Sequence, residues 1–118
     1  MSTAKFNQWL NSDGTENYKC RAWVNFNGTG TVAIRASGNV SSITDNGTGN
    51  YTVNFTTAMP DTNGAIACGV AGTISEPTTS NPVAPAAFIS TSQVRVRTTN
   101  PTSNAVFDAE GVYIAIFR

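Results

Sequence analysis

The sequence predicts an all-β fold: a single antiparallel β-sandwich, jelly-roll-like, with seven or eight short strands. Composition is the first indication, because Thr, Asn, Ser and Gly supply 50 of the 118 residues, against one leucine and two lysines. Helices favour Leu and Lys, whereas Thr suits strands and Asn and Gly suit turns. Short stretches of alternating apolar and polar residues also recur, separated by Asn-Gly turns. No stretch after residue 18 has the period of an amphipathic helix.

The first predicted strand covers residues 19–26, where side chains alternate in character. Its inward face consists of Cys20, Ala22, Val24 and Phe26, and its outward face of Lys19, Arg21, Trp23 and Asn25. A second strand at residues 31–37 follows the turn sequence NGTG. Asn and Gly tolerate the positive φ of tight hairpin turns, so these two strands are expected to form a hairpin.

A second hairpin is predicted from residues 40–44 and 51–56, which flank the sequence DNGTGN at residues 45–50. This group of side-chain oxygens and glycines has some of the composition of a calcium loop. An EF-hand loop needs a bidentate glutamate at its twelfth position, where this chain has Thr56. The preferred interpretation is therefore a β-bend whose side-chain oxygens bond to the turn backbone.

The remainder of the chain is divided by turns and one long loop. Strands are expected at residues 65–72, 94–99 and 111–118, with a polar turn at residues 100–104. Residues 76–85 contain three of the five prolines and have no periodicity. We expect them to form an exposed loop, the longest in the domain.

Residues 1–18 differ from the rest of the chain and are predicted to be an N-terminal arm, with the sandwich at residues 19–118. The arm is polar except for Phe6, Trp9 and Leu10. A polar arm on a lone domain would fray. Three bulky apolar residues within it indicate that it docks on its own domain or on a partner.

Charge and hydropathy exclude several classes of protein. Seven acidic and seven basic residues give no net charge, which removes any bulk attraction to nucleic acid or to an anionic membrane. An apolar content of 40% is too high for a disordered chain without net charge. No apolar run is long enough for membrane insertion, and the N-terminus lacks the apolar core of a secretory signal. We expect synthesis and folding in the cytoplasm.

The two cysteines, Cys20 and Cys68, each lie in an apolar, strand-like stretch. In a reducing compartment they are expected to be small buried hydrophobic residues. Spacing alone does not decide whether they pair in a disulfide.

The sequence argues against catalysis. It contains no histidine, which excludes Ser-His-Asp and Cys-His mechanisms and every histidine-based metal site. Asp108 and Glu110 are two positions apart, a spacing that does not suggest carboxylates held across a cleft. The glycine-rich turns lack the lysine or following helix of a phosphate-binding loop. We predict a non-enzymatic protein without metal or cofactor.

Residues 18–61 closely resemble a module common in tailed-bacteriophage proteins, especially at the distal ends of tail fibres. The motifs that carry the resemblance are RAWVNF, GNVSSI, DNGTG and NFTTAMP, in that order. The later sequences TSQVRVRTTN and VYIAIFR are also similar to closing segments of that family. Residues 63–90 depart from it, with Gly64 where a bulky aromatic residue is typical. The resemblance implies an all-β virion module that forms a homotrimer and has no enzymatic activity.

Two functions are compatible with this resemblance. A chain of 118 residues that starts at Met1 lacks the long shaft of a tail fibre. The first expectation is therefore a capsid decoration (cement) protein, which stabilises the head by bridging capsomers and has the major capsid protein as its partner. The alternative is a distal tail-fibre domain that binds a host-cell receptor. Either protein would be located in the virion after synthesis in the host cytoplasm.

Candidate contact residues follow from expected exposure rather than from a motif. The expected contacts with a partner such as the capsid are Phe6, Trp9 and Leu10 in the arm, and Pro82 and Pro85 in the proline-rich loop.

The trimer contact is expected to use outward arginines and aromatic residues, because both favour interfaces. These residues are Arg21, Trp23, Arg95, Arg97 and Tyr113. A plainer explanation for the arginines is solubility and the protection of strand edges.

Overall fold

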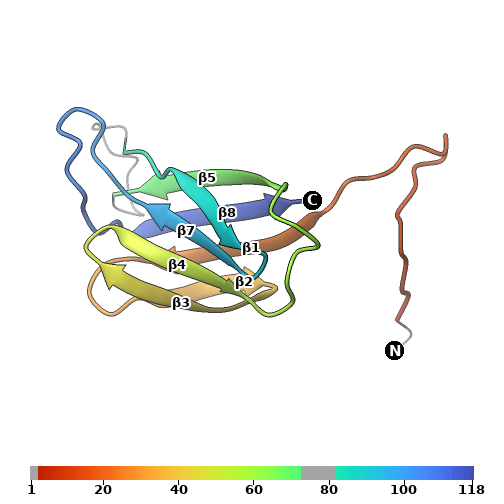
Figure 1. Ribbon diagram of the computed structural model, residues 1–118, viewed down its shortest axis with the longest axis horizontal. Coiled ribbons are helices and arrows are strands. Elements are labelled where there is room, and N and C mark those ends of the chain that lie inside the picture. Colours follow the sequence, from red (N-terminus) through yellow and green to blue (C-terminus); the bar gives the residue numbers. More distant parts are fainter. Residues whose placement is uncertain (1–2, 73–81) are drawn as a thin grey trace.

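The computed structural model describes residues 3–72 and 82–118, and its regular secondary structure is entirely β. Two four-stranded antiparallel sheets pack face to face, so the predicted β-sandwich is confirmed (Figure 1). The strands are β1 (Cys20–Asn27), β2 (Ala33–Gly38), β3 (Val40–Gly47), β4 (Asn50–Phe55), β5 (Ala65–Ala71), β6 (Ala86–Ser90), β7 (Gln93–Arg97) and β8 (Gly111–Phe117).

The strand order is β2-β1-β8-β5 in the first sheet and β3-β4-β7-β6 in the second. Three hairpins join β1 to β2, β3 to β4 and β6 to β7. The last strand, β8, lies between β1 and β5 and pairs with both. Sequence alone left this order open, and it did not predict β6, whose sequence AAFIS does not alternate between apolar and polar residues.

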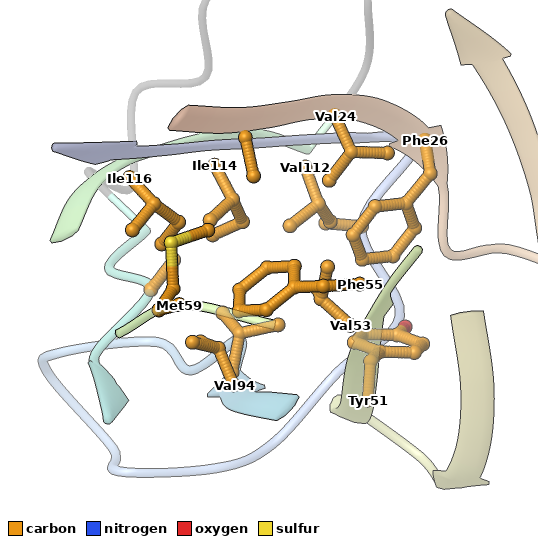
Figure 2. Packing of buried hydrophobic residues seen from close by; sticks show 14 residues of the cluster. Val24, Phe26, Tyr51, Val53, Phe55, Met59, Val94, Val112, Ile114 and Ile116 are labelled. Atoms are coloured by element: carbon orange, nitrogen blue, oxygen red, sulfur yellow. The ribbon is translucent and has the colours of Figure 1, made fainter. Parts of the chain in front are cut away.

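The inward side chains of both sheets form one core (Figure 2). In β1, Ala22, Val24 and Phe26 are buried, which confirms the predicted inward face at these three positions. The rings of Phe26 and Tyr51 meet edge to face, with their centroids 5.2 Å apart. Phe26 lies on β1 of the first sheet and Tyr51 on β4 of the second. The two largest buried side chains therefore pack against each other between the sheets.

The sequence DNGTGN forms the bend between β3 and β4, as predicted. Gly47 pairs with Asn50, which leaves two residues in the turn, and both Gly47 and Gly49 have positive φ. The Asp45 carboxylate accepts a hydrogen bond from the Gly47 backbone N–H at 3.0 Å. Asn46 donates its side-chain amide to the Thr52 hydroxyl at 2.7 Å. Asp45 Oδ1 thus bonds to the turn backbone as predicted, whereas Asn50 Oδ1 is buried without a hydrogen-bond partner among the described residues.

A polar network ties this bend to the segment before β8. Asp108 Oδ1 accepts from the Gly49 N–H at 2.9 Å and lies 2.8 Å from the Tyr51 hydroxyl. The same hydroxyl lies 3.0 Å from the carbonyl oxygen of Gly28, in the β1–β2 turn. A phenol has one proton, and a charged acceptor binds it more strongly than a carbonyl does. Burial and the Asp108 carboxylate both raise the pKa of Tyr51.

The proline-rich stretch differs in part from its prediction as an exposed loop. Val83 and Thr99 exchange two backbone hydrogen bonds of 3.0 Å, and Arg97 N–H donates to Pro85 O at 3.0 Å. Ala84 between them is buried. Residues 82–85 therefore continue the pairing of β6 with β7, whereas residues 76–81 lie outside the described residues.

Asp61 and Arg118 form a bidentate ion pair between the loop after β4 and the residue that follows β8. Arg118 Nε lies 2.7 Å from Oδ1 of Asp61, and its Nη2 lies 2.5 Å from Oδ2. The guanidinium and the Asn63 N–H lower the pKa of Asp61, while Asp61 raises the pKa of Arg118.

Asp61→Asn is expected to lower the free energy of unfolding at pH 7, and the loss should shrink below about pH 4. A carboxyl group with a lowered folded-state pKa stabilises the fold above its unfolded pKa of about 3.9. That contribution disappears as the pH falls toward the folded-state pKa. Urea unfolding of the wild-type and variant proteins between about pH 7 and pH 3 measures the difference. A difference that stays constant over this range would contradict the assigned role of the pair.

Candidate interaction surfaces

The outer face of the first sheet carries two aromatic side chains that lie across glycines. A Cβ on Gly38 would lie 2.9 Å from Cδ1 of Trp23, and one on Gly69 would lie 3.3 Å from Cδ2 of Tyr113. The Tyr113 hydroxyl likewise occupies the space beside Gly111. Glycine at these positions thus lets the rings lie against the sheet, yet Trp23 and Tyr113 remain 44% and 37% exposed.

A shallow trough of about 360 Å³ lies on this face. Its outward lining consists of Trp23, Asn25, Ala67, Gly69, Tyr113 and Ala115. None of these side chains is charged, and their polar groups are the Asn25 amide, the Tyr113 hydroxyl and the Trp23 indole N–H. An exposed surface with aromatic side chains and no charge is typical of a contact site.

Sequence analysis identified only two residues of the trough. Trp23 and Tyr113 were predicted as contact residues because aromatic side chains favour interfaces, whereas Asn25, Ala67 and Ala115 were not predicted. The floor of the trough joins three strands that are distant in the sequence, β1, β8 and β5. The signal that could have found it is the presence of isolated glycines inside strands, which mark a close approach of another group.

The outer face of the second sheet is polar. Asn54 Nδ2 donates to the hydroxyls of Ser42 and Thr44 at 3.1 and 3.0 Å, and its Oδ1 accepts from Gln93 Nε2 at 2.9 Å. These bonds cross from β3 through β4 to β7. The amides and hydroxyls of this face therefore largely satisfy one another.

The five predicted trimer residues do not share one face. Trp23 and Tyr113 lie on the outer face of the first sheet, next to Arg21 on β1. Arg95 and Arg97 are exposed on β7 of the second sheet. One flat interface between two copies could therefore include the residues of the first sheet or those of the second, but not both. The trimer itself stays a prediction.

The arm projects away from the sandwich. Figure 1 shows residues 3–19 leaving at the start of β1 and running clear of both sheets. Phe6, Trp9 and Leu10 are 64%, 57% and 49% exposed. The Phe6 and Trp9 rings have centroids 6.1 Å apart, so the predicted arm residues form a cluster.

Part of the arm folds as a small hairpin, which the sequence analysis missed. Leu10 and Glu16 form an isolated β-bridge, and Asn17 N–H donates to Trp9 O at 2.6 Å. In the turn, Asp13 Oδ1 accepts from the Thr15 N–H at 2.9 Å. The Asp-Gly pair at the tip was the available signal, since it favours such turns.

The two groups of predicted partner contacts lie apart. The arm enters β1 at Cys20, which pairs with Phe117 at the end of β8. Pro82 and Pro85 line a separate hollow with Val70, near the far end of β5. The structure therefore does not join the arm cluster and the prolines into one surface.

The expectation that both cysteines are buried is wrong. Cys20 and Cys68 are free thiols and both are exposed. Cys20 is the first residue of β1, and Cys68 lies on β5, at the edge of its sheet. Positions at a strand start and on an edge strand lack a neighbour that would cover them.

Both thiols are expected to react with iodoacetamide in the folded protein. Burial raises the pKa of Cys68, and the thiolate is the nucleophile, so Cys68 should react more slowly than Cys20. Mass spectrometry over time near neutral pH measures both rates, and urea-unfolded protein is the control in which the two rates should converge. If Cys68 reacted only after unfolding, the exposed position assigned to it would be wrong.

The described residues form neither a cluster of metal ligands nor a membrane-spanning helix. Within residues 3–72 and 82–118, no three His, Cys, Asp or Glu side chains are grouped so that they could hold a metal ion. The same part of the chain contains no helix long and apolar enough to cross a membrane.

Comparison with known proteins identifies a fold but no family. No protein-family model and no curated protein match the chain. Among solved structures it is similar to the phiAB6 tailspike, crystallised in complex with three-repeated oligosaccharides of Acinetobacter baumannii surface polysaccharide. The TM-score is 0.62 at 16% identity, and the similarity covers 92% of this chain but 22% of the tailspike chain. The fold of this protein is thus one that also occurs within a phage tailspike.

Proposed function

We propose that this chain is a structural module of a tailed-bacteriophage virion that acts by binding through its surfaces. The observation that carries the proposal is the fold shared with part of a phage tailspike over 92% of the chain. The phage-like motif order within residues 18–61 supports it independently. The proposal assigns the chain no catalytic step, no cofactor and no nucleic acid.

The tail is the preferred location. A likeness to a tailspike favours a distal tail module whose partner is a receptor on the host cell. The homotrimer belongs to the proposal through the sequence resemblance alone. The chain matches less than a quarter of that tailspike's length, so the receptor chemistry is left to experiment. This preference reverses the order expected from sequence, which rested on the length of the chain.

Capsid decoration is the second candidate, and the arm favours it. A projecting segment with three exposed apolar side chains suits a clamp between capsomers. Each contact would be weak, but many contacts on a closed shell act together because each further one is effectively intramolecular.

Immunogold labelling of the phage that encodes the chain tests the proposal. Antibody raised against the purified protein should label the tail tip, at a copy number that fits one or a few trimers per fibre. Dense labelling of the head would replace the tail assignment with decoration. Purified particles that contain none of the chain by mass spectrometry would refute both virion roles.

A further inference from the structure

Two exposed apolar surfaces stand out among the described residues. One is the arm cluster, Phe6, Trp9 and Leu10, which surrounds a hollow of about 300 Å³ together with Gln8. The other is the trough between Trp23 and Tyr113 on the first sheet. Among the described residues, every hydrogen bond found for residues 3–17 stays within the arm.

We propose that residues 6–10 of one copy dock in the trough between Trp23 and Tyr113 of a second copy. The inference rests on the proposed function only in assuming that copies of the chain associate, and it is independent of head or tail location. It also gives the arm a role other than binding to the capsid or a receptor.

The two surfaces match in chemistry. Residues 6–12, with sequence FNQWLNS, contain no charge, and neither does the outward lining of the trough. The amides of Asn7 and Gln8 can bond to Asn25, which is the polar group on the trough floor. Burying an uncharged segment against an uncharged trough leaves no ion without a partner.

The charges at the borders are also complementary. Beyond the uncharged segment, the arm hairpin carries the carboxylates of Asp13 and Glu16. Beside the trough, Arg35 donates to Asn25 Oδ1 at 3.2 Å and to the backbone oxygen of Glu110 at 2.6 Å. Arg21 lies two residues before Trp23 on β1. An arm seated in the trough would bring two acids toward two arginines, which favours association and sets its direction.

The direction of the arm favours a second copy over the trough of the same chain. Between Asn17, the last residue bonded within the arm hairpin, and the start of β1 at Cys20 there are only Tyr18 and Lys19. Trp23 follows three residues later, so docking in the same copy would require a sharp reversal at residues 17–19. Figure 1 shows the chain instead running outward from β1 at this point.

Analytical ultracentrifugation provides the first measurement. The wild-type protein should form a reversible oligomer, and Trp9→Ala should weaken it about 30-fold or more, as expected for a central tryptophan in an interface. Ile89→Ala is the matched control, since Ile89 is also a large exposed apolar residue but lies on β6 of the other sheet. A wild-type protein that stays monomeric at high concentration, or equal effects of the two variants, would overturn the proposal.

Crosslinking between two variants tests the contact directly. In a Cys20→Ser, Cys68→Ser background, Gln8→Cys on an untagged chain is mixed with Ala67→Cys on a tagged chain, and a flexible bis-maleimide is added. We expect a covalent tagged–untagged pair. Ala87→Cys in place of Ala67→Cys is the control, because Ala87 is an exposed alanine on β6, and this pair should be at least about tenfold less abundant if the contact is specific.

The outcomes separate the arm contact from the homotrimer. Oligomers that form with equal crosslinking to positions 67 and 87 would refute arm docking and leave the homotrimer intact. A double variant with both Gln8→Cys and Ala67→Cys that crosslinks only within one chain would show that the arm covers its own sheet, and would also refute the proposal.

Discussion

Replacing Gly49 with alanine is expected to lower the free energy of unfolding by about 4 kcal/mol. Gly49 is buried and has a φ of 60°, which L side chains rarely adopt. A Cβ there would lie 2.7 Å from Thr98 O and 2.8 Å from Phe107 O. Both are backbone atoms, so the overlap can be relieved only if the β3–β4 bend separates from the segments beside it. Urea denaturation at constant pH measures the loss.

Gly30→Ala is the matched control for this prediction. Gly30 has a φ of 59°, nearly identical to that of Gly49, but a Cβ there meets nothing within 4 Å. Its substitution should show only the intrinsic cost of an alanine in the left-handed region, about 1 kcal/mol. Equal losses at the two sites would mean that close packing around Gly49 contributes nothing, contrary to the structure.

Tyr51→Ala is expected to cost about 4 kcal/mol, because a fully buried ring is lost and the cavity cannot fully collapse. Tyr51 has no exposed surface and packs edge to face on Phe26. This loss of stability should have one contribution from the buried ring and one from the hydroxyl group. Tyr51→Phe keeps the ring and removes the hydroxyl that bonds Asp108 and approaches Gly28 O, and we expect about 1.5 kcal/mol for it.

Tyr18→Phe provides the control for the hydroxyl. Tyr18 is 79% exposed, so its hydroxyl bonds to water in both the folded and the unfolded state, and removing it should change the stability by less than about 0.5 kcal/mol. Thermal and urea unfolding of the four proteins give the values. If Tyr51→Phe were as stable as the wild type, the hydroxyl would not tie the β1–β2 turn to the segment before β8.

The two positions have a common consequence for the binding surfaces. Gly49 lies in the bend between β3 and β4, and Tyr51 lies on β4 of the second sheet. Both bond to Asp108, which lies shortly before β8 of the first sheet. Tyr113 of β8 lies in the trough. Because this network joins the sheets at one end, we expect it to fix the position at which β8 begins beneath the trough.

Local sequence determined the class of fold and much of the strand pattern. Alternation over residues 19–26 predicted the buried face of β1 at Ala22, Val24 and Phe26, and Asn-Gly pairs predicted the bends of the first two hairpins. Both signals are local, because the side-chain period of a strand and the φ of a turn depend on adjacent residues. The motifs that resemble a phage module fall in this same region, and the fold is one that also occurs within a phage tailspike.

Tertiary structure decided which residues are buried and which residues are neighbours, because the local pattern does not contain the strand order. Cys20 falls on the predicted inward face and Cys68 lies in an apolar stretch, yet both are exposed, because one starts its strand and the other lies on an edge strand. The proline-rich stretch gains order by pairing Val83 with Thr99. Arg21 and Arg95 share an outward pattern but lie on different sheets. In each case burial or neighbourhood depends on strand order, which is set by contacts between residues far apart in the chain.

The candidate interaction surfaces were likewise predicted in part from the sequence and in part only from the fold. The sequence by itself determined that Phe6, Trp9 and Leu10 stand out in a polar arm and that Trp23 points outward. It marked Tyr113 only as an aromatic residue of the kind that favours interfaces. Only the tertiary structure decided that the two aromatic rings border one trough, because β8 inserts between β1 and β5 and places residues from three strands side by side. A sequence specifies side-chain direction locally, whereas a surface is formed by long-range strand pairing.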